Sequence, residues 1–296
     1  MEQKPEDQIA IGGKRLVESA RHDLMNVALD DGGEQAYTTV SAYGVDSGLV
    51  LGCHTSSDAG SEHQCVERTL ELIDVRGSVV TMDAGNAYPK FCNLILSGKG
   101  DYLLCIKGNN AKSQEWCRQI FDAEVDRPYS KTTSHSSARG DRRDIRVAHL
   151  RTEDNSGVSD RECDLNLKSY WPHALSVVEV TRERTTRNNQ LNELGEKKKS
   201  THTVYYVSSQ HLVASDADRY IRSHWHVENK LHWVMDVYYG EDASRSKSGY
   251  IAQNLAAIKR LSNNMLAAVT GKSSRLRYQM KFALDENWRN EVWGLI

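Results

Sequence analysis

The stretch "SVVTMDAGNAYPKFCNLILSGKGDYLLCIKGNN", residues 78–110, decides the fold class. Its first apolar run ends at Asp83 in a turn that contains glycine. The segment after it has Pro89 near its start and glycines at its end, a pattern typical of a helix. A second apolar run, residues 101–110, follows at once. Strand, helix and strand in this order predict two parallel strands joined by a right-handed crossover.

Upstream of this unit, three segments rich in β-branched and aromatic residues predict an antiparallel meander. They span residues 8–16, 36–45 and 48–56. The pair Gly12-Gly13 predicts that the first strand ends in a turn, and "DSG" at 46–48 predicts a hairpin between the other two. Apolar residues at helical spacing predict a helix over 62–76.

Downstream, the pattern changes from α/β to mainly β. Residues 111–125 predict a helix, and three alternating runs predict strands at 143–151, 174–184 and 201–209. Residues 215–236 and 249–269 then return to helical spacing. The sequence therefore predicts an α/β core interrupted by a β-rich insertion. The predicted parts are the first part of the core at 8–110, the insertion at 111–215 and the C-terminal helices of the core at 216–296.

The composition is that of a globular chain: 26% of the 296 residues are charged and 39% are hydrophobic. No apolar run approaches the ~18 residues that a membrane span needs. The polar N-terminus "MEQKPEDQ" lacks the apolar core of a secretory signal. Six cysteines without a CxxC pair are typical of reduced thiols. We therefore expect a cytoplasmic protein with no membrane partner.

Charge is distributed unevenly along the chain. The net charge of −2 argues against nucleic-acid binding, but basic residues cluster at 139–151, 182–199 and 259–281. Local patches matter more than the sum for binding phosphate. Each cluster could equally be an ordinary solvated surface.

The segment "RSHWHVENKLHWVMDV", residues 222–237, surrounds one glutamate with aromatic and histidine side chains. His224, Glu228 and His232 share one helix face. A zinc hydrolase is one interpretation, although the two histidines lie about 12 Å apart along the axis. In the second interpretation, Asp83 at a strand end and Glu228 on a helix hold Mg²⁺, which prefers oxygen ligands. By position alone, Asp83 is also a common turn residue, and the tryptophans are as typical of packing.

These motifs resemble those of the H-repeat-associated transposases of bacterial insertion sequences, which are DDE transposases with an RNase H-like fold. "IRSHWHVENKLHWVMDVYYGEDASR" is similar to the family's "HWxIENxLHWVLDVxFxED". The segments "VSAYGVDSGLVLG", "RRDIRV", "NLAAIKRLSNNML" and "DENW", and the opening stretch, resemble further family elements. The resemblance covers nearly the whole chain. It implies a mixed sheet flanked by helices, with the β-rich insertion preceding the helix that carries the catalytic glutamate.

The resemblance also implies a mechanism with two Mg²⁺ or Mn²⁺ ions, in which water cleaves an element end and the freed 3′-OH attacks target DNA. It implies that Asp83 and Glu228 are catalytic acids and metal ligands. The DNA-contacting residues are expected among Lys14, Arg15, Lys107, Asn109, Arg142, Arg146, Arg222, Lys272, Arg275 and Arg277. The residues expected to orient the glutamate or to pack are His224, Trp225, Asn229, His232, Trp233, Asp236, Asp242 and Arg245. The expected partners are element-end and target DNA, and a second copy of the chain.

Three departures from the family pattern predict impaired activity. The family reads "AIDGKTLRGS" where this chain reads "AIGGKRLVES", so Gly12 stands in place of the first acid. Asp7, five residues earlier, is a poor replacement, and of the family's "DEKSNE" only Asp58 and Ser61 persist. The family's N-terminal helical domain is also expected to be missing. The sequence thus predicts a DDE transposase that is truncated or degenerate, or a non-catalytic remnant that still binds DNA.

Overall fold

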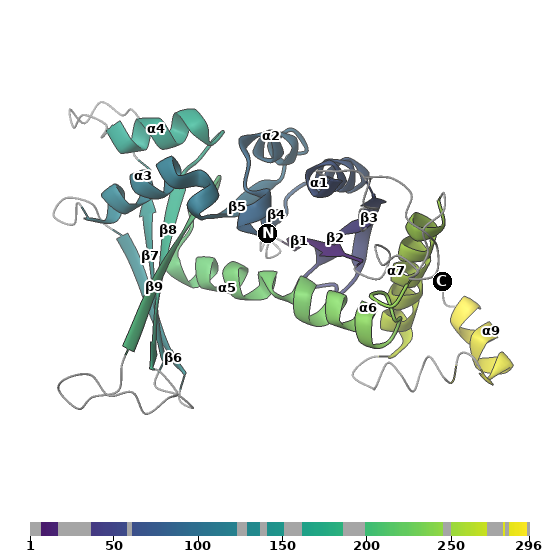
Figure 1. Cartoon of the computed structure of the whole chain (residues 1–296). Coiled ribbons are helices and arrows are strands. Elements are labelled where there is room, and N and C mark those ends of the chain that lie inside the picture. The colour runs from purple at the N-terminus through teal and green to yellow at the C-terminus, as the bar shows by residue number, and fades with distance from the viewer. Residues whose placement is uncertain are drawn as a thin grey trace, which may run out of the picture. The chain divides into compact units, whose positions relative to one another are not determined.

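The structure is a computed structural model of the whole chain (Figure 1). It describes residues 7–16, 37–57, 61–122, 129–136, 141–150, 162–185, 199–244, 250–270, 281 and 284–294. The chain forms two compact units, residues 1–75 with 224–296 and residues 76–223. No helix within the described ranges is long and apolar enough to cross a membrane.

The first unit contains the predicted meander. Its strands are β1 (Gln8–Arg15), β2 (Thr38–Gly44) and β3 (Val50–Ser56), in the order β3-β2-β1 with antiparallel pairing. The prediction that Gly12-Gly13 ends the first strand is wrong, because Gly12 pairs with Ser41 and Gly13 with Val40 inside the ladder. The extended backbone of a strand accommodates glycine, so β1 continues to Arg15.

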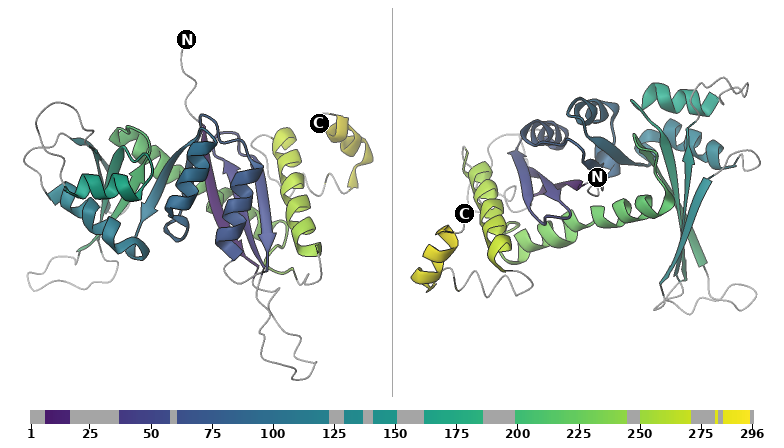
Figure 2. Two further views of the ribbon diagram at one scale, coloured as in Figure 1. Left: turned by 90° about the horizontal axis from the view of Figure 1, so that it is seen from above. Right: turned by 180° about the vertical axis from the view of Figure 1, so that it is seen from behind.

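Helices complete the first unit. They are α1 (Ser61–Leu72), the π-helix η4 (Val227–His232), α6 (Trp233–Val237), α7 (Ile251–Thr270) and α9 (Glu286–Gly294). Both α1 and α7 contact β3, and Figure 2 shows α7 running beside that strand. A core of Ala10, Tyr43, Val227, Leu231 and Met235 joins the sheet to the η4–α6 segment.

The second unit begins with the crossover that the opening stretch predicts. Strand β4 (Val79–Met82) and strand β5 (Asp101–Ile106) are parallel, and α2 (Pro89–Ser97) connects them. Short 3₁₀ turns follow each strand, η2 (Ala84–Asn86) after β4 and η3 (Gly108–Asn110) after β5. The carboxyl ends of parallel strands lie at one edge of a sheet, so the two turns are neighbours.

The rest of the second unit is the β-rich region. It contains α3 (Ala111–Asp122), β6 (Tyr129–Ser136), β7 (Asp141–His149), α4 (Glu162–Tyr170), β8 (Ser176–Thr185), β9 (Lys199–Ser208) and α5 (Ala214–His224). The strand order is β4-β5-β9-β8-β7-β6. Helix α5 covers one face of these strands, while α3 and α4 lie together on the other side (Figure 1). The sequence had predicted neither β6 nor α4.

The predicted fold class, a mixed α/β fold in which helices flank a mixed sheet, is therefore confirmed. The boundaries predicted at 8–110, 111–215 and 216–296 stay a prediction. All six cysteines are free, and five of them are buried. Burial raises the pKa of the Cys105 thiol to about 11, which keeps this thiol protonated at neutral pH.

A buried arginine fixes α7 to the first unit. Arg260 is 2% exposed, and its Nε donates to Ser41 Oγ on β2 at 2.8 Å. Its Nη1 donates to Glu241 Oε1 at 2.6 Å. Because α7, β2 and the loop after α6 converge on this guanidinium, removing it would leave Glu241 buried with weakened compensation.

We therefore predict that Arg260→Ala lowers the free energy of unfolding by about 3 kcal/mol or more. The matched control is Arg68→Ala, because Arg68 pairs with Glu71 at the surface. Surface pairs contribute little, so the control should change stability by less than about 1 kcal/mol. Urea denaturation followed by circular dichroism measures both values. Equal losses in the two variants would contradict the anchoring role of Arg260.

Candidate active site

The helical segment predicted over 215–236 is present, but it is interrupted by a turn at Trp225 and widened around Glu228. Helix α5 ends at His224, and residues 227–232 form a π-helix before α6 begins at Trp233. The Trp233 N–H closes this wide turn by donating to the Glu228 carbonyl five residues back. Such π segments are rare and are frequent at functional sites.

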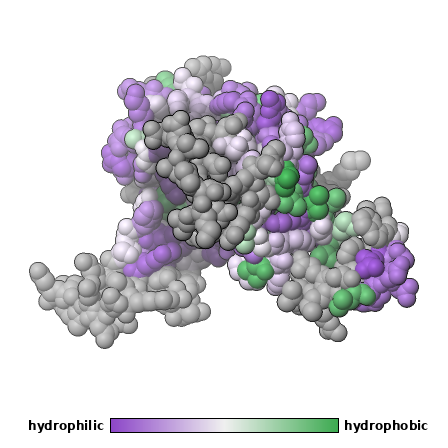
Figure 3. Space-filling view, turned by 45° about the vertical axis from the view of Figure 1, so that its right-hand side comes forward, coloured by the Kyte–Doolittle hydropathy of each residue, from purple (hydrophilic) through white to green (hydrophobic). Residues whose placement is uncertain are grey.

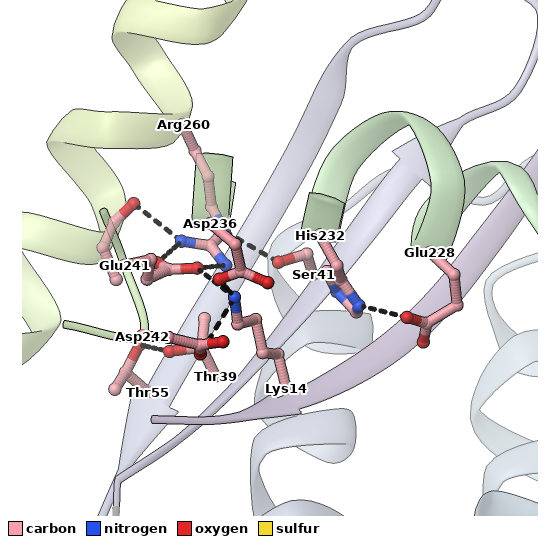
Figure 4. A network of polar contacts seen from close by, with 11 residues as sticks. Lys14, Thr39, Ser41, Thr55, Glu228, His232, Asp236, Glu241, Asp242 and Arg260 are labelled. Carbon is pink, nitrogen blue, oxygen red and sulfur yellow. Dashed lines mark hydrogen bonds and ion pairs between the residues drawn. The ribbon is translucent and has the colours of Figure 1, made fainter. Parts of the chain in front are cut away.

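The Glu228 carboxylate is held by the imidazole of His232. The His232 Nδ1 lies 3.1 Å from Glu228 Oε2 (Figure 4). The hydrogen bond from His232 is the main cause that lowers the pKa of Glu228, against the opposing effect of burial. Charges on His224 and Lys14 lower that pKa further. Glu228 is therefore a carboxylate at neutral pH with a fixed orientation.

Gly12 lies against this same segment. A Cβ atom built on Gly12 would sit 3.0 Å from each methyl carbon of Val227 and 3.1 Å from His232 Cε1. Real Cβ atoms seldom come so close to a neighbour, so Val227 and His232 would have to shift by a few tenths of an ångström to admit a side chain at position 12. His232 is 4% exposed, and its Nε2 has no hydrogen-bond partner among the described residues.

Lys14, two residues further along β1, lies within a cluster of acidic side chains. Its Nζ forms an ion pair with Asp236, lies 3.2 Å from Asp242 Oδ1 and 3.9 Å from Glu241 Oε2 (Figure 4). The Lys14 side chain is only 8% exposed. This environment favours a structural role, in which Lys14 ties β1 to the segment after Glu228, over the predicted DNA contact.

Asp83 begins the turn after β4 in the second unit. Its Oδ1 accepts hydrogen bonds from the backbone N and the Nδ2 of Asn86, at 3.2 and 3.1 Å. The turn is also held from the end of β5: Asn109 Nδ2 donates to the Ala84 carbonyl at 2.6 Å, and Asn110 Nδ2 to the Ala87 carbonyl at 3.0 Å. Asn109, predicted as a DNA contact, thus positions the backbone beside Asp83, whose side chain is exposed.

The other predicted contacts lie in different surroundings. Arg142 pairs with Asp144, Arg146 with Glu179 and Arg222 with Asp218. The residues whose side chains are exposed are Arg15, Lys107, Trp225, Asn229 and Trp233, and His224 is half-buried. Figure 3 shows hydrophobic residues exposed at separate places between hydrophilic ones. The positions Arg245, Lys272, Arg275 and Arg277, like Asp58, lie outside the described residues.

The side chains present do not make a complete set of metal ligands. Hard divalent ions need several oxygen ligands, and Gly12 supplies none from its side chain. No group of three or more histidine, cysteine, aspartate or glutamate residues in the described ranges is arranged to hold a metal ion. The same observation gives no support to a zinc centre at His224 and His232.

Two residues that shape this site were missed by sequence reasoning. The sequence pattern places Arg260 in the basic cluster at 259–281. Arg260 nevertheless follows Ala256 at helical spacing, on the buried face of α7. That i, i+4 position on an apolar face is the signal that could have found it. Val227 was treated only as part of the motif, and nothing in the sequence showed that it fills the space at Gly12.

The sequence of this chain is similar to those of several known proteins. The model of a family described as "Transposase DDE domain" matches residues 29–265. Putative transposase YncI of Escherichia coli O157:H7 is 30% identical over 86% of this chain. H repeat-associated putative transposase YhhI and putative protein YbfL, both of Escherichia coli (strain K12), are each 28% identical over 97% of this chain. The chain spans 62% of the length of YncI and 71% of the other two.

A solved structure, the cryo-EM structure of the piggyBac transposase synaptic complex with hairpin DNA, also aligns with the chain. The alignment has a TM-score of 0.44 and 10% identity, and it covers 99% of this chain and 58% of that chain.

The contacts of Gly12 predict a steric penalty for any side chain at this position. Gly12→Ala should lower the free energy of unfolding by about 1–3 kcal/mol, because the new methyl group collides with Val227. Gly108→Ala is the control, since a Cβ there meets no atom within 4 Å. It should be neutral or stabilise by about 0.4–1 kcal/mol.

A double variant tests whether Val227 is the cause. In Gly12→Ala/Val227→Ala the collision is relieved, so the effects of the two single changes should couple by more than about 0.5 kcal/mol. Thermal and urea unfolding of the four proteins measure this coupling. Simple additivity would mean that Val227 does not restrict position 12.

Proposed function

The chain belongs to the family of transposases with a DDE domain, and we propose that it is a DDE-type transposase whose DNA cleavage and strand transfer are impaired at residue 12. The observation that carries this proposal is the contact of Gly12 with the Glu228 segment. Residue 12 faces the helix that bears Glu228. A first catalytic acid would have to lie at residue 12. A glycine there supplies no carboxylate, and its backbone packs against Val227 and His232.

The Nε2 of His232, which has no hydrogen-bond partner in the described part of the chain, supports the same proposal. The Nδ1 of this histidine faces Glu228 Oε2, and its Cε1, bonded to Nε2, is the ring atom nearest to the Cβ position of Gly12. A buried polar atom without a partner costs about 1–3 kcal/mol, so its presence suits a site built around an acid that this chain has lost.

The remaining acids in this proposal are Asp83 and Glu228, and the family implies that they act with a divalent cation, Mg²⁺ or Mn²⁺. Such ions activate a nucleophile and stabilise a leaving oxygen when two of them are held together. With two carboxylates in place of three, the chain's own residues do not fit a pair of metal ions.

The proposed partner is DNA, at element ends and at the target, with a second copy of the chain as a further expected partner. The second candidate function is a non-catalytic protein that still binds DNA. The basic residues of the inserted strands favour it, because phosphate binding requires positive charge but no catalytic acid. The two candidates differ only in whether phosphodiester bonds are broken.

The cleavage test uses linear DNA that carries the regions flanking this chain's own gene, with Mg²⁺ or Mn²⁺. We predict no nicking by the unmodified chain. In Gly12→Asp/Val227→Ala the acid is restored together with room for it, and detectable strand cleavage is expected. The matched control is this double variant with Glu228→Ala added, which should be inactive.

The outcomes separate the candidates. Cleavage by the unmodified chain that survives Asp83→Ala would contradict the assignment of the site. If the restored variant stays inactive but the unmodified chain binds the DNA, the non-catalytic candidate holds.

A further inference from the structure

The arginines on the two faces of strand β7 have different surroundings. Side chains alternate along a strand, and Ile145 and Val147 lie in the core beneath α5. Arg143 is two residues before Ile145 and therefore lies on the α5 face. Arg142 and Arg146 lie on the opposite face, which α3 and α4 cover. The basic cluster at 139–151 is thus two separate groups in space.

The arginines of the opposite face are neutralised within the protein. Arg142 Nη2 lies 2.7 Å from Asp144 Oδ2. Arg146 Nη2 lies 2.7 Å from Glu179 Oε1, and its guanidinium stacks 5.1 Å from the ring centroid of Phe121. Each has a carboxylate of its own, so this face offers little net charge to a ligand.

The α5 face differs because its arginines lie opposite one another. In the strand register, Ser134 pairs with Arg143, Arg143 with Arg182, and Arg182 with His202. These four residues form one row across β6, β7, β8 and β9, about 14 Å long at about 4.8 Å per strand. Like charges directly opposite on neighbouring strands destabilise a sheet, so the two arginines are placed unfavourably unless an anion lies between them.

Helix α5 adds a third arginine and one carboxylate. Arg222 Nη2 donates to Ser134 Oγ at 2.7 Å, and its Nε donates to Asp218 Oδ1 at 2.9 Å. The same oxygen lies 2.8 Å from Arg143 Nη1. Arg182 forms no ion pair with any residue that the structure describes. Within the described part of the chain, the guanidinium groups of Arg143, Arg182 and Arg222 therefore share one carboxylate, that of Asp218.

Arg143 carries unused donors. Its Nε and Nη2 are buried and have no hydrogen-bond partner within the described part of the chain. Burial is the largest cause that lowers the pKa of Arg143; Asp218 opposes it, and the charges of Arg182 and Arg222 lower it further. A guanidinium with two donors still available beside two more cations is a favourable partner for an oxyanion.

We propose that Arg143, Arg182 and Arg222 form a binding site for the phosphate groups of a DNA strand. The chemistry fits, because the planar fork of arginine matches the oxygens of phosphate. The row is open to solvent at His202, and Arg222 beside Ser134 is exposed, which suits a chain of phosphates better than a single enclosed anion. The inference rests on the proposed DNA-binding function and names where the backbone is held.

The test measures binding of the full chain to a fluorescein-labelled duplex of about 30 base pairs, by anisotropy, from about 50 to 200 mM KCl. Arg182→Gln should weaken binding about fivefold and reduce the slope of log Kd against log salt by about 1. The matched control is Arg118→Gln on α3, on the other side of the same sheet, where Arg118 pairs with Glu115 and Asp122; it should leave both quantities unchanged. Arg143→Gln should act like Arg182→Gln, but it removes a partly buried group.

Arg182→Gln is the deciding variant, because Arg182 forms no ion pair with any described residue and circular dichroism can verify an unchanged melting temperature. If the unmodified chain binds and Arg182→Gln binds equally well with the same salt slope, the phosphate site is wrong and DNA binding stands. Equal losses in Arg182→Gln and Arg118→Gln would also overturn it, since only total charge would then matter. A chain that binds no DNA at all would overturn the proposed function as well.

Discussion

The buried ion pair between Arg260 and Glu241 is the interaction on which the first unit depends. Both side chains are about 2% exposed, and the guanidinium also bonds Ser41 on β2. Lys14 extends the network from β1 to Asp236 and Asp242. Because charges this deeply buried are costly to separate, the helices that flank Glu228 cannot shift away from the sheet without breaking several of these contacts. The position of Glu228 next to β1 follows from that constraint.

Because this network is rigid, a glycine in place of the first acid at residue 12 leaves the position of the Glu228 segment unchanged. The network holds the Glu228 segment close to β1 whether or not an acid is present there. Val227 then lies where a side chain at position 12 would extend, and His232 keeps its bond to Glu228 while its other nitrogen stays unpaired. The fold around Glu228 is thus stable without the first catalytic acid. A framework maintained by buried ion pairs and apolar packing does not need the metal ligands in order to fold.

The sequence was sufficient for the parts of the fold that its patterns encode. The strand–helix–strand order at 78–110, the meander and the spacing of the motif around Glu228 predicted the α/β class correctly. Strand β6, "YSKTTSHS", escaped because it is polar throughout and is held by its register with β7 rather than by an apolar face. The π-helix at 227–232 also escaped, since helical periodicity does not distinguish i+4 from i+5 bonding. The division of the arginines at 139–151 between two faces depends on strand register, which composition cannot supply.

The central claim is that residue 12 is a glycine packed against Val227 and His232, so that this chain has no acid beside Glu228. Crystals of the protein soaked in Mn²⁺ test it directly, because manganese gives an anomalous signal. The account predicts that Gly12 lies in van der Waals contact with Val227 and that no anomalous peak lies between residue 12 and Glu228. A pair of manganese ions bound there, with Val227 turned away, would contradict it.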